Sequence, residues 1–319
     1  MRFMYRKLPP RRTKVFIPGT PGSKVLAVLF LTALLLLPCP AFADWSPLIG
    51  RLVADGFDES AVRALFSRPE VRFDPGAMST KLEELVRKVW RKPAGPPSYN
   101  PKAVYKGFLM EKVITRARSY LRENAEFLEK ISSEYHVPKE IIVSILLVET
   151  RLGDFMGRKW AFNSLAGMAL CTELETIRPY LPKKLVSSKN EDFARTICRQ
   201  KADWAYAELK ALIRYAYWSG FDPLSLPGSI YGAIGLCQFM PSNIYSYGVD
   251  ADNDGRIDLF TKADALASIA NYLREHGWTG TLDKTSQLRV ILKYNKNSTY
   301  ANTVLAVAEK LKDTSRIKQ

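Results

Sequence analysis

Apolar residues recur every three or four positions along most of this chain, and no segment shows the clean alternation of a half-buried strand. This spacing gathers the apolar side chains on one face of a helix, so it predicts a predominantly all-α protein. The expected helices cover residues 46–55, a segment opening at 58–60, residues 78–90, 101–135 with an interruption near Arg122, a helix that begins at Pro138 and carries Glu149, and residues 204–219, 241–247, 262–275, 286–293 and 300–311.

Two segments interrupt the helical pattern. Residues 92–98 combine three prolines with a glycine, which is typical of a linker. Residues 171–200 are polar and irregular, and we expect no long helix in them. The chain therefore divides into an N-terminal segment 1–43, a helical region with its linker 44–98, and a core 99–319.

The first segment has the pattern of a secretory signal peptide. Seven basic residues and no acid precede the apolar residues 25–37, and Ala41-Phe42-Ala43 offers a cleavage site. The apolar stretch is shorter than the ~20 residues that a spanning helix needs. We therefore expect an exported, periplasmic protein. We expect no lipid anchor at Cys39, because Pro38 precedes it where a small residue is usual.

The charge of the remaining chain limits its partners. The net charge is +15, and removing the seven basic residues of the first segment leaves +8. A moderately basic exported protein suits an anionic partner such as a cell-wall polymer or a membrane surface. No basic cluster follows the signal segment, so we expect no nucleic acid partner.

The few cysteines and histidines limit which disulfides, metal sites and catalytic groups the chain can form. Cys171 and Cys198 bracket the irregular segment and are the natural disulfide pair, although free buried thiols, including Cys237, also fit the spacing. His136 and His276 are the only histidines, which argues against a His-rich metal site and against a Ser-His-Asp triad.

Glu149 occupies a position where a charged residue is unusual. Helical spacing places it on the same apolar face as Ile142 and Ile145, near the end of its helix. Burial and the negative end of the helix dipole would raise its pKa, and a carboxyl group still protonated near neutral pH can act as a general acid. A salt bridge with Arg151 or Lys139 would explain the same position equally well.

Residues 250–258 match the first part of an EF-hand calcium loop. Acids stand at loop positions 1, 3 and 5, and a glycine at position 6 permits the sharp turn. Thr261 replaces the bidentate Glu of position 12, so a longer loop would have to close on a later carboxylate. The candidate ligands are Asp250, Asp252, Asp254, the carbonyl of Arg256, and Asp264. The alternative is a solvated acidic turn without a metal.

Two further segments carry groups suited to sugars. Residues 228–242 contain three glycines, which permit close backbone approach, together with a hydroxyl and a carboxamide. Residues 294–305 place aromatic and amide groups near a helix start. The side chains concerned are Ser229, Gln238, Tyr294, Asn295 and Tyr300. Taken alone, residues 228–242 could instead be a glycine-rich connection between helices. The tyrosines of residues 294–305 could instead belong to a helical core.

Taken together, these segments resemble the bacterial lytic murein transglycosylases of the B type (MltB-like). The resemblance rests on residues 135–153, 228–242, the acidic loop, residues 270–278 and Tyr294-Asn295 with Tyr300. It implies a lysozyme-like helical catalytic core in an α-rich enzyme. It also implies cleavage of the β-1,4 bond between N-acetylmuramic acid and N-acetylglucosamine in peptidoglycan, with 1,6-anhydromuramoyl ends.

The resemblance also assigns roles to residues. Glu149 would be the sole catalytic acid and base, with no cofactor for catalysis and with Ca²⁺ as a structural ion. Glycan strands would contact Ser229, Gln238, Tyr272, Tyr294, Asn295 and Tyr300. We expect a monomer, and its protein partners would be cell-wall or envelope proteins. Residues 171–200 depart from the pattern of the family, so the resemblance assigns no role to any residue in that stretch.

Two other functions compete with this one. A hydrolytic muramidase usually needs a second carboxylate about 5–9.5 Å from the acid. Asp154 would lie on another side of the helix if the helix continued, and no other acid is marked. A non-catalytic, calcium-stabilised peptidoglycan-binding protein would tolerate loss of Glu149, so its presence on an apolar face argues against that function.

Overall fold

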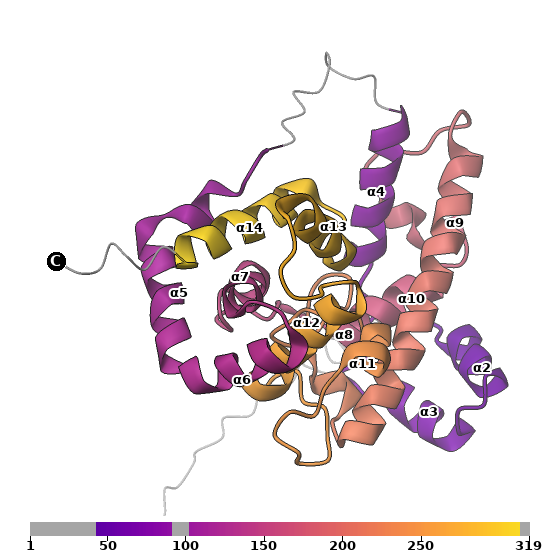
Figure 1. The fold of residues 1–319 in the computed structure, drawn as a ribbon. Helices are drawn as coiled ribbons and strands as arrows, with labels where there is room; N and C mark the ends of the chain where they lie inside the picture. Colours follow the sequence, from indigo (N-terminus) through magenta and orange to yellow (C-terminus); the bar gives the residue numbers. More distant parts are fainter. Residues whose placement is uncertain (1–42, 91–101, 313–319) are drawn as a thin grey trace, which may run out of the picture. The chain divides into compact units, whose positions relative to one another are not determined.

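The computed structural model describes residues 43–90 and 102–312 of the chain. Residues 1–42 of the predicted signal segment, Cys39 and the linker 92–98 lie outside the described residues. The described part is almost entirely helical, as predicted (Figure 1). None of its helices is both long enough and apolar enough to cross a bilayer.

The helix α7 (Lys139–Thr150) lies at the centre of one group of helices (Figure 1). Residues 141–147 are all buried, and a helix that is apolar all round has to be enclosed by others. The helices that contact it are α5 (Glu111–Glu123), α6 (Ala125–Tyr135), α12 (Lys262–Glu275) and α14 (Ser298–Lys312). The group is completed by α13 (Lys284–Tyr294), which packs on α12 and α14, and the short 3-10 helix η2 (Lys106–Leu109).

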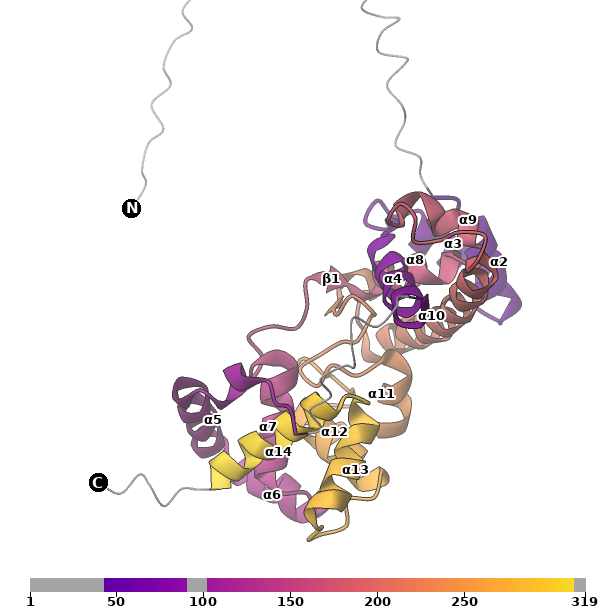
Figure 2. The ribbon, with the colours of Figure 1, turned by 90° about the horizontal axis from the view of Figure 1, so that it is seen from above.

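A second group forms around the long helix α10 (Glu191–Ser219) (Figure 2). Its members that contact α10 are α4 (Gly76–Trp90), α8 (Ala161–Leu170), α9 (Leu174–Ile177) and α11 (Pro241–Tyr247). Two further helices, α2 (Ser46–Ala54) and α3 (Glu59–Phe66), pack on each other, and α2 also contacts α8. The short 3-10 helices η3 (Arg178–Tyr180) and η4 (Pro223–Ser225) join these elements.

The start of α10 corrects one prediction. The helix was expected from residue 204, but it begins at Glu191, inside the segment 171–200 expected to be irregular. Its first turns bury Ala194, Cys198 and Ala202 at helical spacing. These side chains are small, so the buried face adds little hydrophobicity to a stretch rich in charges.

The expected long helix at residues 101–135 is also divided. Among its described residues, 102–105 are not helical, and α5 and α6 meet at Asn124, close to the interruption expected near Arg122. His136 ends α6 with a left-handed φ of +56°, and Pro138 precedes the first residue of α7. Proline fixes φ at a value compatible with a helix start, so this boundary was predictable.

Two strands of two residues each were not predicted. β1 (Lys159–Trp160) pairs antiparallel with β2 (Pro227–Gly228), and Lys159 lies opposite Gly228. The pairing brings Gly157, at φ +102°, so close that an added Cβ would lie 1.9 Å from the carbonyl oxygen of Gly228. Only glycine fits there, and the close contact fixes the chain that leads away from α7.

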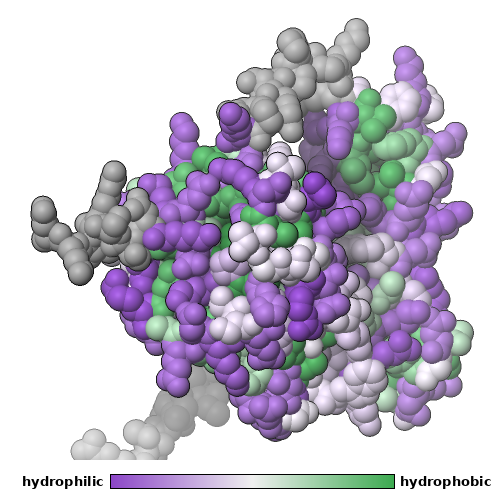
Figure 3. Space-filling model, in the orientation of Figure 1, coloured by the Kyte–Doolittle hydropathy of each residue, from purple (hydrophilic) through white to green (hydrophobic). Residues whose placement is uncertain are grey.

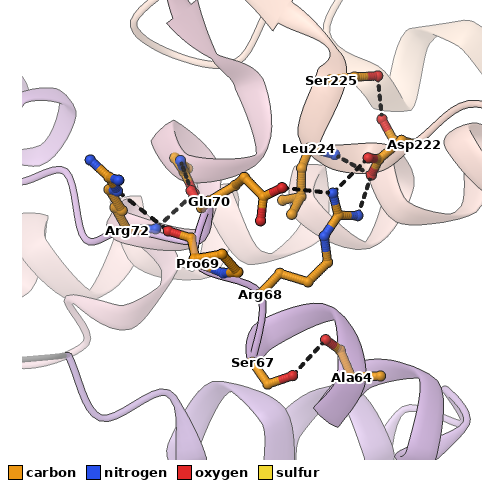
Figure 4. Close-up of polar contacts among 10 residues, drawn as sticks. Ala64, Ser67, Arg68, Pro69, Glu70, Arg72, Asp222, Leu224 and Ser225 are labelled. Atoms are coloured by element: carbon orange, nitrogen blue, oxygen red, sulfur yellow. Dashed lines mark hydrogen bonds and ion pairs between the residues drawn. The ribbon is translucent and has the colours of Figure 1, made fainter. Parts of the chain in front are cut away.

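The N-terminal helices are attached to η4 by one ion pair, which Figure 4 shows. The guanidinium of Arg68 donates two hydrogen bonds of 2.8 Å to the carboxylate of Asp222. The same carboxylate accepts a hydrogen bond from the backbone N–H of Leu224 and caps η4. A bidentate pair of this kind fixes orientation as well as distance.

The three cysteines in the described residues, Cys171, Cys198 and Cys237, are free thiols, so the disulfide suggested by the sequence is not formed. Cys171 and Cys198 are nevertheless neighbours, since the Cys198 thiol donates to the Cys171 carbonyl oxygen at 3.0 Å. Burial raises the pKa of both thiols. The alternative of free buried thiols therefore describes this structure.

One face of the molecule is mainly hydrophilic. Figure 3 shows this face; its largest green, apolar area lies at the upper right, on the side where α4 lies in Figure 1, and smaller green areas lie at its centre and left. At the end of that helix, Val89 and Trp90 are 59% and 48% exposed.

Candidate active site

Glu149 lies in the last turn of α7, and its side chain is only partly exposed. Burial raises the pKa of this carboxyl group from 4.5 to about 7, and the Tyr300 hydroxyl moderates the rise. No ion pair to Glu149 exists within residues 43–90 and 102–312, and Lys139 pairs with Glu129 at 2.5 Å instead. The salt-bridge alternative is therefore wrong, and the carboxyl group can hold a proton near neutral pH.

Two tyrosines lie near this carboxyl group. Tyr300, on α14, is only 4% exposed, and its hydroxyl makes no hydrogen bond of ordinary geometry to the described residues, although it acts on the charge of Glu149. Tyr294, at the end of α13, donates to the carbonyl oxygen of Cys237 at 2.6 Å. Burial raises the Tyr294 pKa, and the neighbouring Cys237 and Glu149 raise it further. Glu149, Tyr294 and Tyr300 therefore form one electrostatic group.

Tyr272 centres a cluster of aromatic rings beside this group. Its ring stacks on His276 with centroids 4.0 Å apart, and it meets Tyr294 edge to face at 4.9 Å. Phe239 and Tyr247 complete the cluster, at 5.6 and 4.7 Å from Tyr272. The Tyr272 hydroxyl donates to the Lys293 carbonyl oxygen at 2.8 Å, so it holds α12 to α13. The resemblance placed Tyr272 and Tyr294 at one site, but no local pattern indicated that Phe239, Tyr247 and His276 would join them.

Thr150 joins the end of α7 to the glycine-rich segment. Its side chain is fully buried, and its hydroxyl donates to the Leu236 carbonyl oxygen at 3.0 Å. The Thr150 hydroxyl oxygen in turn accepts a hydrogen bond from the Gly153 backbone N–H at 3.2 Å. A buried hydroxyl is costly to leave unpaired, so these bonds fix where Glu149 lies relative to residues 228–242.

The glycine-rich segment turns back on itself next to this contact. The Ser229 hydroxyl oxygen accepts from the Ala233 backbone N–H at 3.0 Å, which leaves its own proton for another acceptor. Gln238 adopts a left-handed φ of +50°, and its side-chain amide donates to the Gly235 carbonyl oxygen at 3.0 Å. Both side chains are partly exposed, so each can still contact a ligand.

Two other polar residues differ in their relation to this site. Asn295 is exposed and directly follows Tyr294, but no described contact joins its side chain to Glu149. Asp154 is exposed and binds the Arg116 guanidinium through both carboxylate oxygens, one of them at 2.6 Å. In the described part of the chain, no second carboxyl group shifts the pKa of Glu149.

The acidic loop before α12 brings three predicted ligands together. The carboxylate oxygens of Asp250, Asp252 and Asp254 lie within 4.8 Å of one another. Backbone N–H groups hold this arrangement, since Asp250 accepts from both Asp254 and Gly255, the latter at 2.9 Å. Three converging carboxylates without a cationic side chain fit a hard cation such as Ca²⁺.

Asp264 has a different place in this loop. It is buried, and its two oxygens accept from the backbone N–H groups of Ala251 at 2.8 Å and Asp258 at 2.6 Å. It therefore ties the two ends of the loop, and its role as a ligand stays a prediction. Thr261, which stands where EF hands have Glu, accepts from the Asp264 N–H and caps α12.

Sequence reasoning missed Thr150 and Cys237 as residues of this site. A threonine closing an apolar run, directly after Glu149, could have been noticed as a buried hydroxyl in need of a partner. Cys237 was considered only as a thiol, whereas its carbonyl oxygen is the group that binds Tyr294. No pattern of side chains reports the direction of a backbone carbonyl.

The sequence profile of the family described as "Transglycosylase SLT domain" matches residues 42–284. The membrane-bound lytic murein transglycosylase B of Escherichia coli is 36% identical over 144 residues. That alignment covers 45% of this chain and 33% of the E. coli protein, so the chain matches about a third of this relative's length.

Solved structures with the same fold include three bacterial lytic transglycosylases. Soluble lytic transglycosylase SltB1 of Pseudomonas aeruginosa has a TM-score of 0.61 at 23% identity, over 84% of this chain and 98% of SltB1. E. coli Slt35 in complex with calcium has a TM-score of 0.62 at 21% identity, over 85% and 95%. P. aeruginosa SltB3 in complex with NAG-NAM-pentapeptide has a TM-score of 0.62 at 22% identity, over 87% and 81%. The predicted lysozyme-like helical fold is confirmed.

Proposed function

The chain belongs to the transglycosylase SLT domain family, and on that premise we propose that it is a lytic murein transglycosylase that cleaves peptidoglycan glycan strands. The observation that carries this proposal is the state of Glu149. Its carboxyl group is partly buried, has no cationic partner in the described residues, and has a pKa of about 7. Such a group can donate a proton and take one back at the pH where it works.

Glu149 acts first as an acid and then as a base. Its proton passes to the glycosidic oxygen as the bond from that oxygen to C1 of N-acetylmuramic acid breaks. The 6-hydroxyl of the same sugar then attacks C1, and its proton returns to Glu149. The products carry a free 4-hydroxyl on N-acetylglucosamine and a 1,6-anhydromuramoyl end, so no water is consumed and the enzyme is regenerated.

The surroundings of Glu149 support each half of this cycle. Tyr300 and Tyr294 bury the carboxyl group without giving it a counter-charge, which keeps the protonated form accessible. The Tyr300 hydroxyl makes no ordinary hydrogen bond to the described residues. When the carboxylate forms, this hydroxyl can donate to it and stabilise the negative charge. Asp154 remains with Arg116, so the chemistry depends on a single carboxyl group.

The glycan strand lies along the glycine-rich segment and the aromatic cluster. Ser229 and Gln238 offer hydrogen bonds to sugar hydroxyl and N-acetyl groups, and the ring of Tyr294 offers an apolar surface. Asn295, which is exposed and follows Tyr294, offers a further polar group to the glycan. SltB3, which shares this fold, is known in complex with NAG-NAM-pentapeptide.

The acidic loop holds a structural Ca²⁺ ion. Asp250, Asp252, Asp254, the carbonyl of Arg256, and Asp264 form its ligand set, and the ion would neutralise the repulsion among the converging carboxylates. Slt35, with the same fold, is known in complex with calcium. The ion stabilises the start of α12, and it takes no part in the chemistry.

The enzyme acts outside the cytoplasm, in the bacterial cell envelope. The pattern of residues 1–43 and the basic charge of the remaining chain support this location.

Digestion of purified sacculi, followed by mass spectrometry, tests the proposed function. The expected products are lighter by one water than those of hydrolysis, and Glu149→Gln abolishes their release. Asp154→Asn is the matched control, because Asp154 is the nearest acid along the chain, and we expect it to keep activity. Products of hydrolytic mass would identify a muramidase, and no products from the unmodified protein would indicate a binding protein.

A further inference from the structure

Three aromatic side chains are exposed where α10 ends and α11 lies against it. Tyr217 and Trp218 are 81% and 65% exposed, and Tyr245 is 43% exposed. Trp218 and Tyr245 meet edge to face, with ring centroids 5.1 Å apart and planes at 78°. None of the residues assigned to the active site belongs to this group, and exposed aromatic clusters often mark binding surfaces.

Trp218 and Tyr245 border a pocket of about 190 Å³. Its walls come from α10, from α11 and from the acidic loop at Gly255 and Arg256. Pockets that hold drug-sized ligands measure about 300–1,000 Å³. This pocket is smaller, so it has room for a single ring rather than for a large ligand or a helix.

The hydroxyl groups around the pocket are already used to hold its walls. The Tyr245 hydroxyl donates to the Ala211 carbonyl oxygen at 3.0 Å, and the Ser219 hydroxyl donates to the Ile257 carbonyl oxygen at 3.3 Å. These bonds join α11 and the acidic loop to α10. The pocket is therefore preformed, and Tyr245 offers its ring rather than its hydroxyl to a ligand.

The two charged side chains of the pocket, Asp250 and Arg256, differ in whether they already have partners within the protein. The Asp250 carboxylate accepts two backbone N–H groups of its own loop, from Asp254 and Gly255. Arg256 is exposed, and its guanidinium forms no ion pair with any residue that the structure describes. The lining thus presents three aromatic rings, those of Tyr215, Trp218 and Tyr245, together with the guanidinium of Arg256 and the Asp250 carboxylate.

We propose that this pocket is a second binding site for peptidoglycan, separate from the cleft of Glu149, in which one N-acetylhexosamine ring stacks on Trp218 and a carboxylate of the attached peptide pairs with Arg256. The proposal rests on the proposed function, which supplies a polymer of alternating amino sugars with anionic peptides. The C–H face of such a sugar is apolar and matches an aromatic ring, and the carboxylate matches the free guanidinium.

A protein partner fits these observations less well. Stable protein interfaces bury about 1,200–2,000 Å² in total. Here the exposed neighbours of the aromatic group, Arg214 and Ser246, are polar, so the apolar area is confined to a few rings. A polymer that occupies both the cleft and the pocket would stay attached between cleavage events, since the second contact becomes intramolecular.

The test measures binding to insoluble sacculi by co-sedimentation, with Glu149→Gln in every protein so that the polymer is not digested. We expect Trp218→Ala to lower the affinity about fivefold or more, which is typical for loss of a central aromatic contact. Tyr217→Ala is the matched control, because this neighbouring aromatic residue is more exposed but does not line the pocket. It should bind like the parent.

A second variant tests the ionic contact. Arg256→Gln should weaken binding to intact sacculi but not to glycan strands from which an amidase has removed the peptides. Melting temperatures within a few degrees of the parent confirm that each variant is folded. Equal affinities of Trp218→Ala and Tyr217→Ala would overturn the second site. Failure of the proposed function is recognised separately, as absence of sacculus digestion by the protein that retains Glu149.

Discussion

Replacement of Glu149 by Gln is expected to stabilise the fold at neutral pH. The pKa of this carboxyl group rises from 4.5 to about 7 because it is buried. A carboxyl group whose pKa is higher in the folded state binds more protons when folded, so the folded state loses stability as the pH rises above 4.5. The penalty is largest above the folded pKa. Gln has nearly the same shape and cannot ionise, so it avoids this penalty.

The magnitude follows from the size of the shift. One pKa unit corresponds to about 1.4 kcal/mol, so the free energy of unfolding should rise by about 3 kcal/mol at pH 7 and by only a few tenths of a kcal/mol at pH 4. For a chain of this size, about 3 kcal/mol corresponds to a rise of roughly 5–10 °C in the melting temperature. Thermal unfolding followed by circular dichroism at both pH values measures the difference.

Glu126→Gln is the matched control, because Glu126 is an exposed glutamate on the neighbouring helix α6. It removes a negative charge of the same kind without changing a buried site. The reasoning would be refuted if Glu149→Gln gave no stabilisation at pH 7, or if it gave the same stabilisation at pH 4 as at pH 7. Either result would mean that the carboxyl group is well solvated in the folded protein.

Two further predictions concern turnover and the acidic loop. Because the first step needs the protonated form of Glu149, kcat/KM for sacculus digestion should fall about tenfold per pH unit above pH 7; a flat profile between pH 6 and 9 would contradict this role. Calcium should raise the melting temperature, by the equivalent of about 2.7 kcal/mol at one hundred times its Kd. A chelator of calcium should reverse this shift, and Asp254→Asn should reduce it. The metal site would be refuted if calcium, the chelator and the substitution all left the melting temperature unchanged.

The helices that bury large side chains were predictable from the sequence. α11 and α12 have the expected bounds, because Pro241 fixes the start of one helix and strong periodicity defines the other. The first half of α10 was missed, since its buried face consists of alanines and Cys198. A helical pattern of apolar residues is easy to recognise when their side chains are large. A face of small side chains allows helices to pack closely but leaves only a weak hydrophobic pattern in the sequence.

Glu149 could be identified because a carboxylate on an apolar helical face is anomalous within a short segment of sequence. Its surroundings could not be derived in this way. Tyr272, Tyr294 and Tyr300 come from three different helices, and their meeting depends on how those helices pack. The bond from Thr150 to the Leu236 carbonyl oxygen depends on backbone direction, which local patterns do not encode.

The enclosure of α7 has a consequence for how this protein can change during evolution. The helix that carries Glu149 is buried along residues 141–147 against four others, so most substitutions in it are expected to destabilise the fold. Residues 228–242 touch the end of this helix through a few hydrogen bonds, and Ser229 and Gln238 are partly exposed. Substitutions at these two positions could change which ligands fit while the carboxyl group stays in place, whereas Cys237 and Phe239 in the same segment are buried. The fold thus separates the enclosed helix that holds the carboxyl group from the few exposed positions beside it that tolerate substitution more readily.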